Sequence, residues 1–370
     1  MAKLLKVLVI MGTRPEAIKL APVILELREN PHTEPVVVVT AQHREMLDQV
    51  LKLFNITPHY DLNLMIPDQT LFHVTGKAIQ GFEKILKEVN PDFVLVQGDT
   101  TTTFMGALAG FYMKKPIGHV EAGLRTGNKY SPFPEEINRR MVSVIADYHF
   151  APTKGNRKNL LSEGISGDKI FVTGNTVIDA LLMTVENGFV HDVIAGDYEK
   201  LILVTAHRRE NFGEPLKNIF QAIRHMAEKY PRVRFVYPVH LNNNVQKPAI
   251  QILNNVPNVI LLPPLDYFTF VNILARADLV LTDSGGIQEE APALGIPVLV
   301  LRNETERPEA VEAGTVKIVG TVRDKIIQET LLLLKNNEAY QKMAQAINPY
   351  GDGKASQRIL NCITNNILKR

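Results

Sequence analysis

The sequence predicts an α/β fold of two Rossmann-like domains, each built on a parallel sheet. Short runs of Val, Ile and Leu without period-2 alternation indicate strands that are buried on both faces. These runs alternate with segments of helical periodicity, as in right-handed βαβ units. The alternation restarts after a polar stretch at 186–200, and 370 residues are too many for one ordinary core. We therefore expect two domains with a cleft between them.

The first series of strands extends from Val7 to Val172. Helical patterns at Glu16–Arg28, His43–Phe54 and Thr102–Met113 follow three of its strands. The strands expected in this series are Val7–Met11, Val36–Val39, Phe93–Gln97, Ile117–Val120, Tyr148–Ala151 and Ile170–Val172. The second series comprises Leu201–Thr205, Phe235–Val239, Val259–Leu262, Leu279–Thr282 and Val298–Leu301. We expect the domains to be residues 1–174 and 175–352, with the boundary lying between Gly174 and Lys200.

Composition excludes several classes of protein. Lys and Arg number 41 and Asp and Glu number 39, a balance that does not favour a nucleic-acid or polybasic membrane surface. Cys362 is the only cysteine, so no intramolecular disulfide can form, which suits a cytoplasmic protein. No apolar stretch approaches the ~18 residues that a bilayer crossing needs. The N-terminal apolar run is interrupted by Lys6 and is better interpreted as a buried first strand than as a signal peptide.

Five charged or glycine-containing motifs each follow an apolar run. They are GTRPEAIK from Gly12, GDTTTT from Gly98, HVEAGLRT from His119, TAHRREN from Thr205 and TDSGGIQEE from Thr282. In open α/β sheets, ligands bind outside the carboxyl ends of the strands. The five motifs therefore predict one active site for an anionic, phosphate-bearing ligand.

Two of these motifs have the form of a turn between a strand and a helix. Thr13 and Glu16 have capping-box spacing, and Arg14 adds a cation at a helix start that could bind an anion. In the second motif, two glycines after Ser284 would let the backbone approach a phosphate, and Glu290 could bind ribose hydroxyls. An ordinary capped helix explains each motif equally well. The chain has no G-x-G-x-x-G and no Walker-A motif, which argues against a nicotinamide site and against NTP hydrolysis.

Three carboxylates come after strands of the first series. Asp99 and Glu121 follow strands directly, and Glu135 opens a helix beside Glu136. Singly, each is more often a helix cap or a solvated charge. Together they lie at one end of the expected sheet, where neighbouring carboxylates raise one another's pKa values, so an acid/base cluster is plausible.

A basic loop follows the first strand of the second series. His207 is followed by Arg208 and Arg209, a combination that can stabilise a leaving phosphate, although a solvated basic loop is about as common. Arg302 and Arg307 follow the last long strand and could reach the same group. No set of histidines and carboxylates has metal-ligand spacing, so we expect no metal and no cofactor.

Taken together, the motifs resemble those of the non-hydrolysing UDP-N-acetylglucosamine 2-epimerases. The resemblance is carried by the five motifs and by AQHREML, SPFPEEINR, TGNTVIDAL, YPVHLN, TERPEA and NPYGDG, from about Leu5 to the C-terminus. It implies a glycosyltransferase-B type fold in which a C-terminal helix, about 353–370, packs back on the first domain. It also implies a homodimer that converts UDP-GlcNAc reversibly to UDP-ManNAc without metal or nicotinamide, supplying ManNAc units for cell-envelope polysaccharide.

The resemblance also assigns roles to individual residues. The residues implied for catalysis are Asp99, Glu121, Glu135, His207 and Lys19. Those implied for UDP binding are Arg14, Ser284, Gly285, Gly286, Glu290 and Arg307. Some relatives bind a second UDP-GlcNAc as an activator, and by position that site would use Gln42, His43, Arg208 and His240. The segment 67–70 lacks an arginine that some relatives have there, which weakens the prediction of activation.

Three rival functions remain open at this point. A hydrolysing epimerase would release ManNAc and free UDP, a glycosyltransferase would need an acceptor, and a nucleotide-sugar sensor would bind without turnover. Fold alone does not choose among them. The carboxylate set together with the His-Arg loop favours epimerisation by elimination and re-addition of UDP.

Overall fold

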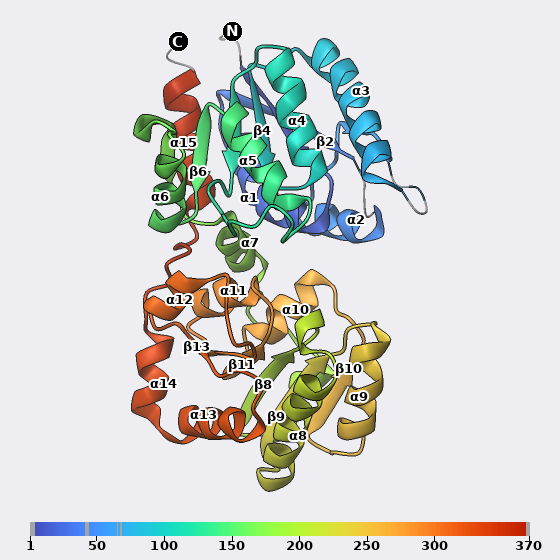
Figure 1. Cartoon of the computed structure of the whole chain (residues 1–370), viewed down its shortest axis with the longest axis vertical. Coiled ribbons are helices and arrows are strands. Elements are labelled where there is room, and N and C mark those ends of the chain that lie inside the picture. The colour runs from blue at the N-terminus through green and yellow to red at the C-terminus, as the bar shows by residue number, and fades with distance from the viewer. Residues whose placement is uncertain (1–3, 41–43, 65, 67–68, 368–370) are drawn as a thin grey trace. The chain divides into compact units, whose positions relative to one another are not determined.

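The computed structural model describes residues 4–40, 44–64, 66 and 69–367. The chain divides into two compact units (Figure 1). Unit 1 comprises Met1–Leu182 together with Tyr350–Arg370, and unit 2 comprises Met183–Pro349. The division after Leu182 lies within the interval from Gly174 to Lys200, and unit 1 also contains the C-terminal segment.

Unit 1 is built on a seven-stranded parallel sheet of order β3-β2-β1-β4-β5-β6-β7. Its strands are β1 (Leu5–Met11), β2 (Thr33–Val39), β3 (Tyr60–Asp61), β4 (Phe93–Gln97), β5 (Ile117–Val120), β6 (Tyr148–Ala151) and β7 (Ile170–Val172). All six predicted strands are present, and β3 is the additional one. Since β4 is buried along its whole length, its continuous apolar run matches a central strand covered on both faces.

The helices of unit 1 follow its strands. They are α1 (Arg14–Glu29), α2 (Arg44–Leu53), α3 (Leu71–Val89), α4 (Thr101–Tyr112), α5 (Glu135–Ile145), α6 (Lys154–Ser162), α7 (Thr176–Thr184) and the C-terminal α15 (Ala355–Ile367). Helix α15 packs against α1, far from it in sequence (Figure 1). Its start is held by Asp179, whose carboxylate accepts hydrogen bonds from the backbone N–H groups of Ala355 and Ser356 and from the Ser356 hydroxyl.

Unit 2 repeats the plan with a six-stranded parallel sheet of order β10-β9-β8-β11-β12-β13. Its strands are β8 (Lys200–Thr205), β9 (Val233–Pro238), β10 (Val259–Leu262), β11 (Leu279–Thr282), β12 (Val298–Val300) and β13 (Val316–Ile318). Its helices are α8 (Glu214–Lys229), α9 (Asn243–Leu253), α10 (Tyr267–Leu274), α11 (Ile287–Ala293), α12 (Pro308–Glu312), α13 (Arg323–Lys335) and α14 (Asn337–Ala344). The five predicted strands are present, and β13 was not predicted.

These observations confirm the predicted fold class of two parallel-sheet α/β domains. In both sheets the order changes direction at the first strand, since β1 lies between β2 and β4 and β8 lies between β9 and β11. This is the position at which open α/β sheets bind ligands. Among the helices of the described residues, none has the length and apolar character that crossing a bilayer requires.

Candidate active site

Glu121 is the most densely contacted of the predicted site residues in unit 1. It follows β5 with a φ of +63°, an uncommon conformation for a residue other than glycine. Its carboxylate accepts hydrogen bonds from Lys19 Nζ at 2.6 and 2.7 Å, from Gln97 Nε2 at 2.5 Å and from Asn175 Nδ2 at 2.9 Å. The residue is only 7% exposed. A buried carboxylate needs such donors, and these donors also fix where it points.

Asp99 lies after β4 and is paired with Arg139 from α5. The Arg139 Nε lies 3.1 Å from Asp99 Oδ2, and Nη2 contacts the same oxygen. The side chain of Asn138 also donates to the Asp99 backbone carbonyl at 2.9 Å. Burial raises the pKa of Asp99 above that of a free aspartate, although the Arg139 guanidinium opposes this rise, and the charge of Glu121 adds to it. Asp99 is therefore better suited to accept a proton than a free aspartate is.

The turn that carries Asp99 is supported by a buried histidine. His119 on β5 is fully buried, and burial lowers its pKa to about 3, so the imidazole is neutral. Its Nε2 lies 2.7 Å from the backbone oxygen of Gly98 and donates a hydrogen bond to it, since a carbonyl can only accept. Gly98 itself has a φ of +75°, which glycine adopts at little cost.

The adjacent carboxylates Glu135 and Glu136, at the start of α5, have different surroundings. Glu136 is fully buried and accepts hydrogen bonds from the backbone N–H groups of Thr126 and Gly127 and from Arg139. Glu135 has a buried Oε2 with no hydrogen-bond partner among the described residues. Glu136 therefore holds its own loop, and Glu135 is the one that has an oxygen available for another group.

The first motif is arranged differently from the sequence prediction. Its capping box is confirmed, because Glu16 reaches back to Thr13. The same carboxylate also accepts the backbone N–H of Gly12 at 2.9 Å and the hydroxyls of Thr100 and Thr103. Because Glu16 accepts the backbone N–H groups of both Gly12 and Thr13, these two groups are not open to an anion. The motif's remaining cations are Arg14 and Lys19, and Lys19 is paired with Glu121.

In unit 2, a buried aspartate organises the His-Arg loop. Asp283 follows β11 and is fully buried. Its Oδ2 accepts the backbone N–H groups of His207 and Arg208, both at 2.8 Å, and the side-chain amide of Asn211 at 3.0 Å. The His207 ring stacks on the His240 ring with centroids 5.3 Å apart. Burial lowers the pKa of His207, and the charge of Asp283 opposes this change.

The glycines of the last motif lie beside two arginines. A Cβ atom added at Gly285 would lie 3.7 Å from Arg208 Nη2 and 3.9 Å from Arg307 Cζ. One added at Gly286 would meet nothing within 4 Å among the described residues, so the backbone here is accessible. Glu290 is buried in α11. The backbone N–H of Ser284 donates a hydrogen bond to Thr282 Oγ1 at 2.9 Å.

The acidic side chains of the loop partly neutralise these arginines. Arg307 contacts Glu289, and Arg208 Nη2 lies 3.9 Å from Glu306 Oε2. Arg302 pairs with Glu210 and Glu306 and is mostly buried, so it is held within the loop. The arrangement gathers basic side chains around an accessible glycine backbone, which is the chemistry of a phosphate site.

The structure therefore places the predicted site residues in two groups. Asp99, Glu121, Glu135, Lys19 and Arg14 lie at the carboxyl ends of the unit 1 strands, and His207, Arg208, His240, Ser284–Gly286, Glu290 and Arg307 lie in unit 2. Gln42 and His43 fall outside the described residues. Gln97, Asn175 and Arg139, which hold the carboxylates, were not predicted. The signal for Gln97 was a polar residue ending the apolar run Phe93–Gln97.

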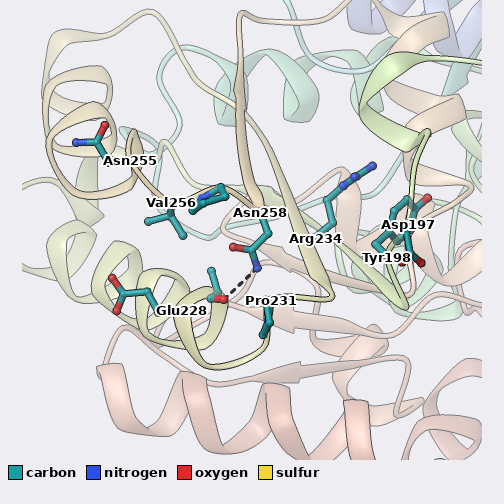
Figure 2. A pocket seen from close by; sticks show the side chains of 10 residues that line it. Asp197, Tyr198, Glu228, Pro231, Arg234, Asn255, Val256 and Asn258 are labelled. Carbon is teal, nitrogen blue, oxygen red and sulfur yellow. Dashed lines mark hydrogen bonds between the residues drawn. The ribbon is translucent and has the colours of Figure 1, made fainter.

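A pocket of about 330 Å³ in unit 2 does not involve these residues (Figure 2). Its lining includes Tyr198 before β8, Arg234 at the start of β9 and Asn258 before β10, so the pocket lies at the amino edge of the sheet. The Asn258 amide donates to the backbone carbonyls of Ala227, Tyr230 and Val233, as Figure 2 shows for one of these bonds. Arg234 likewise donates hydrogen bonds to the backbone carbonyls of Val193 and Ala195. The pocket's polar groups serve the fold.

Comparison with known proteins shows which family this chain belongs to. Residues 25–364 match the family model described as UDP-N-acetylglucosamine 2-epimerase. The chain is 55% identical to the UDP-N-acetylglucosamine 2-epimerase of Bacillus subtilis over 360 residues, covering 97% of this chain and 94% of that protein. It is 53% identical to the Escherichia coli K12 protein of the same name over 372 residues, covering 98% and 99%. The solved structure of the Neisseria meningitidis UDP-GlcNAc 2-epimerase, with UDP-GlcNAc bound, superposes with a TM-score of 0.86 at 53% identity, covering 98% of this chain and all of that one.

Proposed function

Because this chain belongs to the UDP-N-acetylglucosamine 2-epimerase family, we propose that it interconverts UDP-GlcNAc and UDP-ManNAc by the non-hydrolysing route. The observation that carries the proposal is the carboxylate cluster of unit 1. Glu121 is fixed by Lys19, Gln97 and Asn175, and Asp99 has a raised pKa beside it. A glycosyl-binding module without chemistry would not need a buried and a half-buried carboxylate, each separately supported, at one sheet edge.

The reaction requires that C2–H of the sugar becomes acidic. When the C1–O bond breaks, its electron pair leaves with the β-phosphate of UDP and C1 gains oxocarbenium character. A carboxylate then removes the C2 proton, and the electrons of the C2–H bond form the C1–C2 double bond of a 2-acetamidoglucal. Delivery of a proton to the opposite face of C2, with return of UDP to C1, completes the inversion. Two proton-handling groups are thus needed.

The carboxylates of unit 1 differ in ways that suit such roles. The raised pKa of Asp99 favours proton uptake, and Glu135 keeps a buried oxygen whose hydrogen-bonding capacity is unused among the described residues. Glu121 forms an ion pair with Lys19, which holds its carboxylate in place. We assign proton transfer to Asp99 and Glu135. We assign to the Lys19–Glu121 pair the role of orienting the sugar.

The basic groups of unit 2 would bind a UDP group. Arg208 and Arg307 near Gly285 would contact the diphosphate, and His207 would face the leaving oxygen. Glu290 would accept the ribose hydroxyls, and Ser284 and Gly286 would line the phosphate site. Such donors stabilise the charge that develops on the leaving group.

Product analysis separates this function from the hydrolysing alternative. We expect incubation with UDP-GlcNAc alone to give a stable mixture with UDP-ManNAc, approached equally from either sugar nucleotide. Free UDP and ManNAc released in proportion to the substrate consumed would contradict the non-hydrolysing route. A requirement for an acceptor sugar would point instead to a glycosyltransferase.

Amide variants test the acid/base assignment. We expect Asp99→Asn and Glu135→Gln each to lower kcat by roughly 10²–10⁴-fold, as for loss of a general acid or base. Glu121→Gln should also lower kcat, because it breaks the ion pair with Lys19 that orients the sugar. The Kd for UDP should change little, because UDP contacts lie in unit 2. Glu88→Gln, at an exposed carboxylate of α3, is the control and should keep the rate. A wild-type rate in both Asp99→Asn and Glu135→Gln would refute the assignment.

We further propose that the chain acts as a homodimer and uses neither metal nor nicotinamide. Phe111, Tyr112 and Val144 present large apolar side chains to solvent on α4 and α5, which supports a second copy covering this face. Light scattering should give twice the 41.4 kDa mass of the chain. A monomeric mass would contradict the proposal. Activation by a second UDP-GlcNAc at Arg208 and His240 stays a proposal, and it should appear as sigmoidal kinetics.

A further inference from the structure

The two carboxylate oxygens of Asp283 have very different surroundings. Oδ2 accepts three hydrogen bonds, from the backbone N–H groups of His207 and Arg208 and from the Asn211 amide. Oδ1 is buried and has no hydrogen-bond partner among the described residues. The side chain of Asp283 is fully buried. A buried, charged oxygen without a donor is costly, so a partner is expected to reach it at some stage of function.

The imidazole of His207 is the group placed to reach that oxygen. Its Nδ1 lies 3.8 Å from Asp283 Oδ1, beyond a hydrogen bond but about 1 Å from one. The three donors on Oδ2 fix the carboxylate, whereas the His207 side chain is 37% exposed and has room to move. The His240 ring stacks on it at an interplanar angle of 17°, which favours sliding of the ring in its own plane. Catalytic hydrogen bonds are often long before ligand binds and shorten in the complex.

We propose that Asp283 is a positioning residue for His207: its Oδ1 accepts a hydrogen bond from Nδ1–H, so that Nε2 is the nitrogen presented to the leaving diphosphate. The identity of that ligand rests on the proposed function, whereas the pairing itself does not. Asp283 would then both fix the backbone of the His-Arg loop and determine which ring nitrogen of His207 carries the proton. This is the part that the buried aspartate plays for histidine in serine proteases.

The charges that face His207 make the pairing useful for catalysis. They are Asp283 after β11, His240 after β9 and Arg208 in its own loop. Without ligand, burial and the two basic groups favour the neutral ring, against Asp283. A bound diphosphate adds negative charge and favours uptake of a proton from solvent at Nε2. The imidazolium then donates Nδ1–H to Asp283 and Nε2–H to the oxygen that departs from C1 with the electron pair of the C1–O bond.

The tautomer of His207 can be observed directly in the wild-type protein. We expect long-range ¹H–¹⁵N spectra of histidine-labelled protein to show neutral His207 with its proton on Nδ1. The signals are assigned by their loss in His207→Gln. A neutral His207 protonated on Nε2 would overturn the proposal. Since this measurement needs neither turnover nor substrate, it stands apart from the test of the proposed function.

An isosteric variant tests the consequence for catalysis. In Asp283→Asn the three donors on Oδ2 require the amide oxygen, so the amide NH₂ faces His207 and Nδ1 must accept. We expect His207 to change to the Nε2–H tautomer and kcat to fall by roughly 10²–10⁴-fold, with the KM for the nucleotide sugar within about threefold. A folded Asp283→Asn protein with unchanged kcat would overturn the proposal.

Asp278→Asn is a matched control. Asp278 precedes the same strand, β11, and accepts the backbone N–H of Leu201 at 2.9 Å and a hydrogen bond from Lys200, far from His207. We expect it to keep both the kcat and the His207 tautomer. If Asp278→Asn lowers kcat as much as Asp283→Asn does and the tautomer is unchanged in both, Asp283 has only a structural role. If wild-type protein shows the Nδ1–H tautomer but no epimerisation, the pairing holds and the proposed function fails.

Discussion

Replacing Asn175 tests how the Glu121 carboxylate is supported. Asn175 is nearly fully buried, and its Nδ2 donates to Glu121 Oε1 at 2.9 Å. Its backbone N–H donates to the carbonyl of Tyr350, where the chain re-enters unit 1. Asn175→Ala removes this hydrogen bond to a charged group, worth about 1.5–3 kcal/mol. It also removes the weaker hydrogen bond that Asn175 Oδ1 accepts from the Val177 backbone N–H at 3.2 Å, which Asn175→Asp keeps. In a unit of about 200 residues, a loss of about 2 kcal/mol lowers Tm by roughly 4–8 °C.

Asn175→Asp should be worse at neutral pH, although its shape is conserved. A second carboxylate 2.9 Å from Glu121 Oε1 would be repelled by about 6 kcal/mol at an effective dielectric constant of 20. The ammonium of Lys19 offsets part of this, but the repulsion still exceeds the lost hydrogen bond. Because the repulsion costs more free energy than the lost hydrogen bond, the aspartate variant should unfold at a clearly lower temperature than the alanine variant.

The difference in stability between Asn175→Asp and Asn175→Ala should become smaller as the pH falls. Repulsion raises the pKa of the introduced carboxyl group in the folded protein above its unfolded value, so the folded state binds the extra proton. Its destabilisation is therefore full above the folded pKa and is relieved as the pH falls through it. Once protonated, the new carboxyl can donate to Glu121 in place of the amide.

Thermal unfolding at pH 7.5 and pH 5 measures both effects. We expect Asn175→Asp to lie well below Asn175→Ala at pH 7.5 and the gap to narrow at pH 5. Asn361→Asp, at an exposed position on α15, controls for the change in net charge and should stay near wild type. Equal stability of Asn175→Asp and Asn175→Ala at pH 7.5 would refute the view that Asn175 supports an ionised Glu121.

Two further predictions concern the fold of unit 1. Gly123→Ala should abolish soluble expression or lower Tm by more than 10 °C, because φ is +92° and a Cβ would lie 2.4 Å from the Asn156 carbonyl oxygen. Gly127→Ala is the control, since Gly127 also has a positive φ but its Cβ would meet nothing within 4 Å among the described residues. We expect Gly127→Ala to lower Tm much less. Asp179→Ala removes the acceptor for the start of α15, so limited proteolysis should release the C-terminal segment faster than in wild type, and unchanged cleavage would contradict the role given to Asp179.

Most of the sheet structure could be predicted from the sequence. Central strands such as Phe93–Gln97 are buried on both faces, and this requires an unbroken apolar run that is easily recognised. The two strands that were missed, Tyr60–Asp61 and Val316–Ile318, are short and only partly buried. Their place in the sheets comes from pairing with neighbouring strands, which local sequence does not encode.

The site was predictable as a set of residues but not as a set of contacts. The carboxylates Asp99 and Glu121 were recognisable because they directly follow buried strands. Their partners Arg139 and Asn175 are 40 and 54 residues away in sequence, so only the folded chain brings them together. Glu16 is a further example, because the capping-box spacing was recognisable but the hydrogen bonds from its carboxylate to Gly12, Thr100 and Thr103 appear only in the folded chain.

The central claim is epimerisation at C2 through elimination of UDP, and isotope exchange tests it most directly. Wild-type protein is incubated with UDP-GlcNAc in deuterated water, and the sugar nucleotides are separated and examined by NMR and mass spectrometry. We expect UDP-ManNAc carrying deuterium at C2, with label entering recovered UDP-GlcNAc at C2 as well. UDP-ManNAc formed without deuterium at C2, or no UDP-ManNAc at all, would contradict the mechanism.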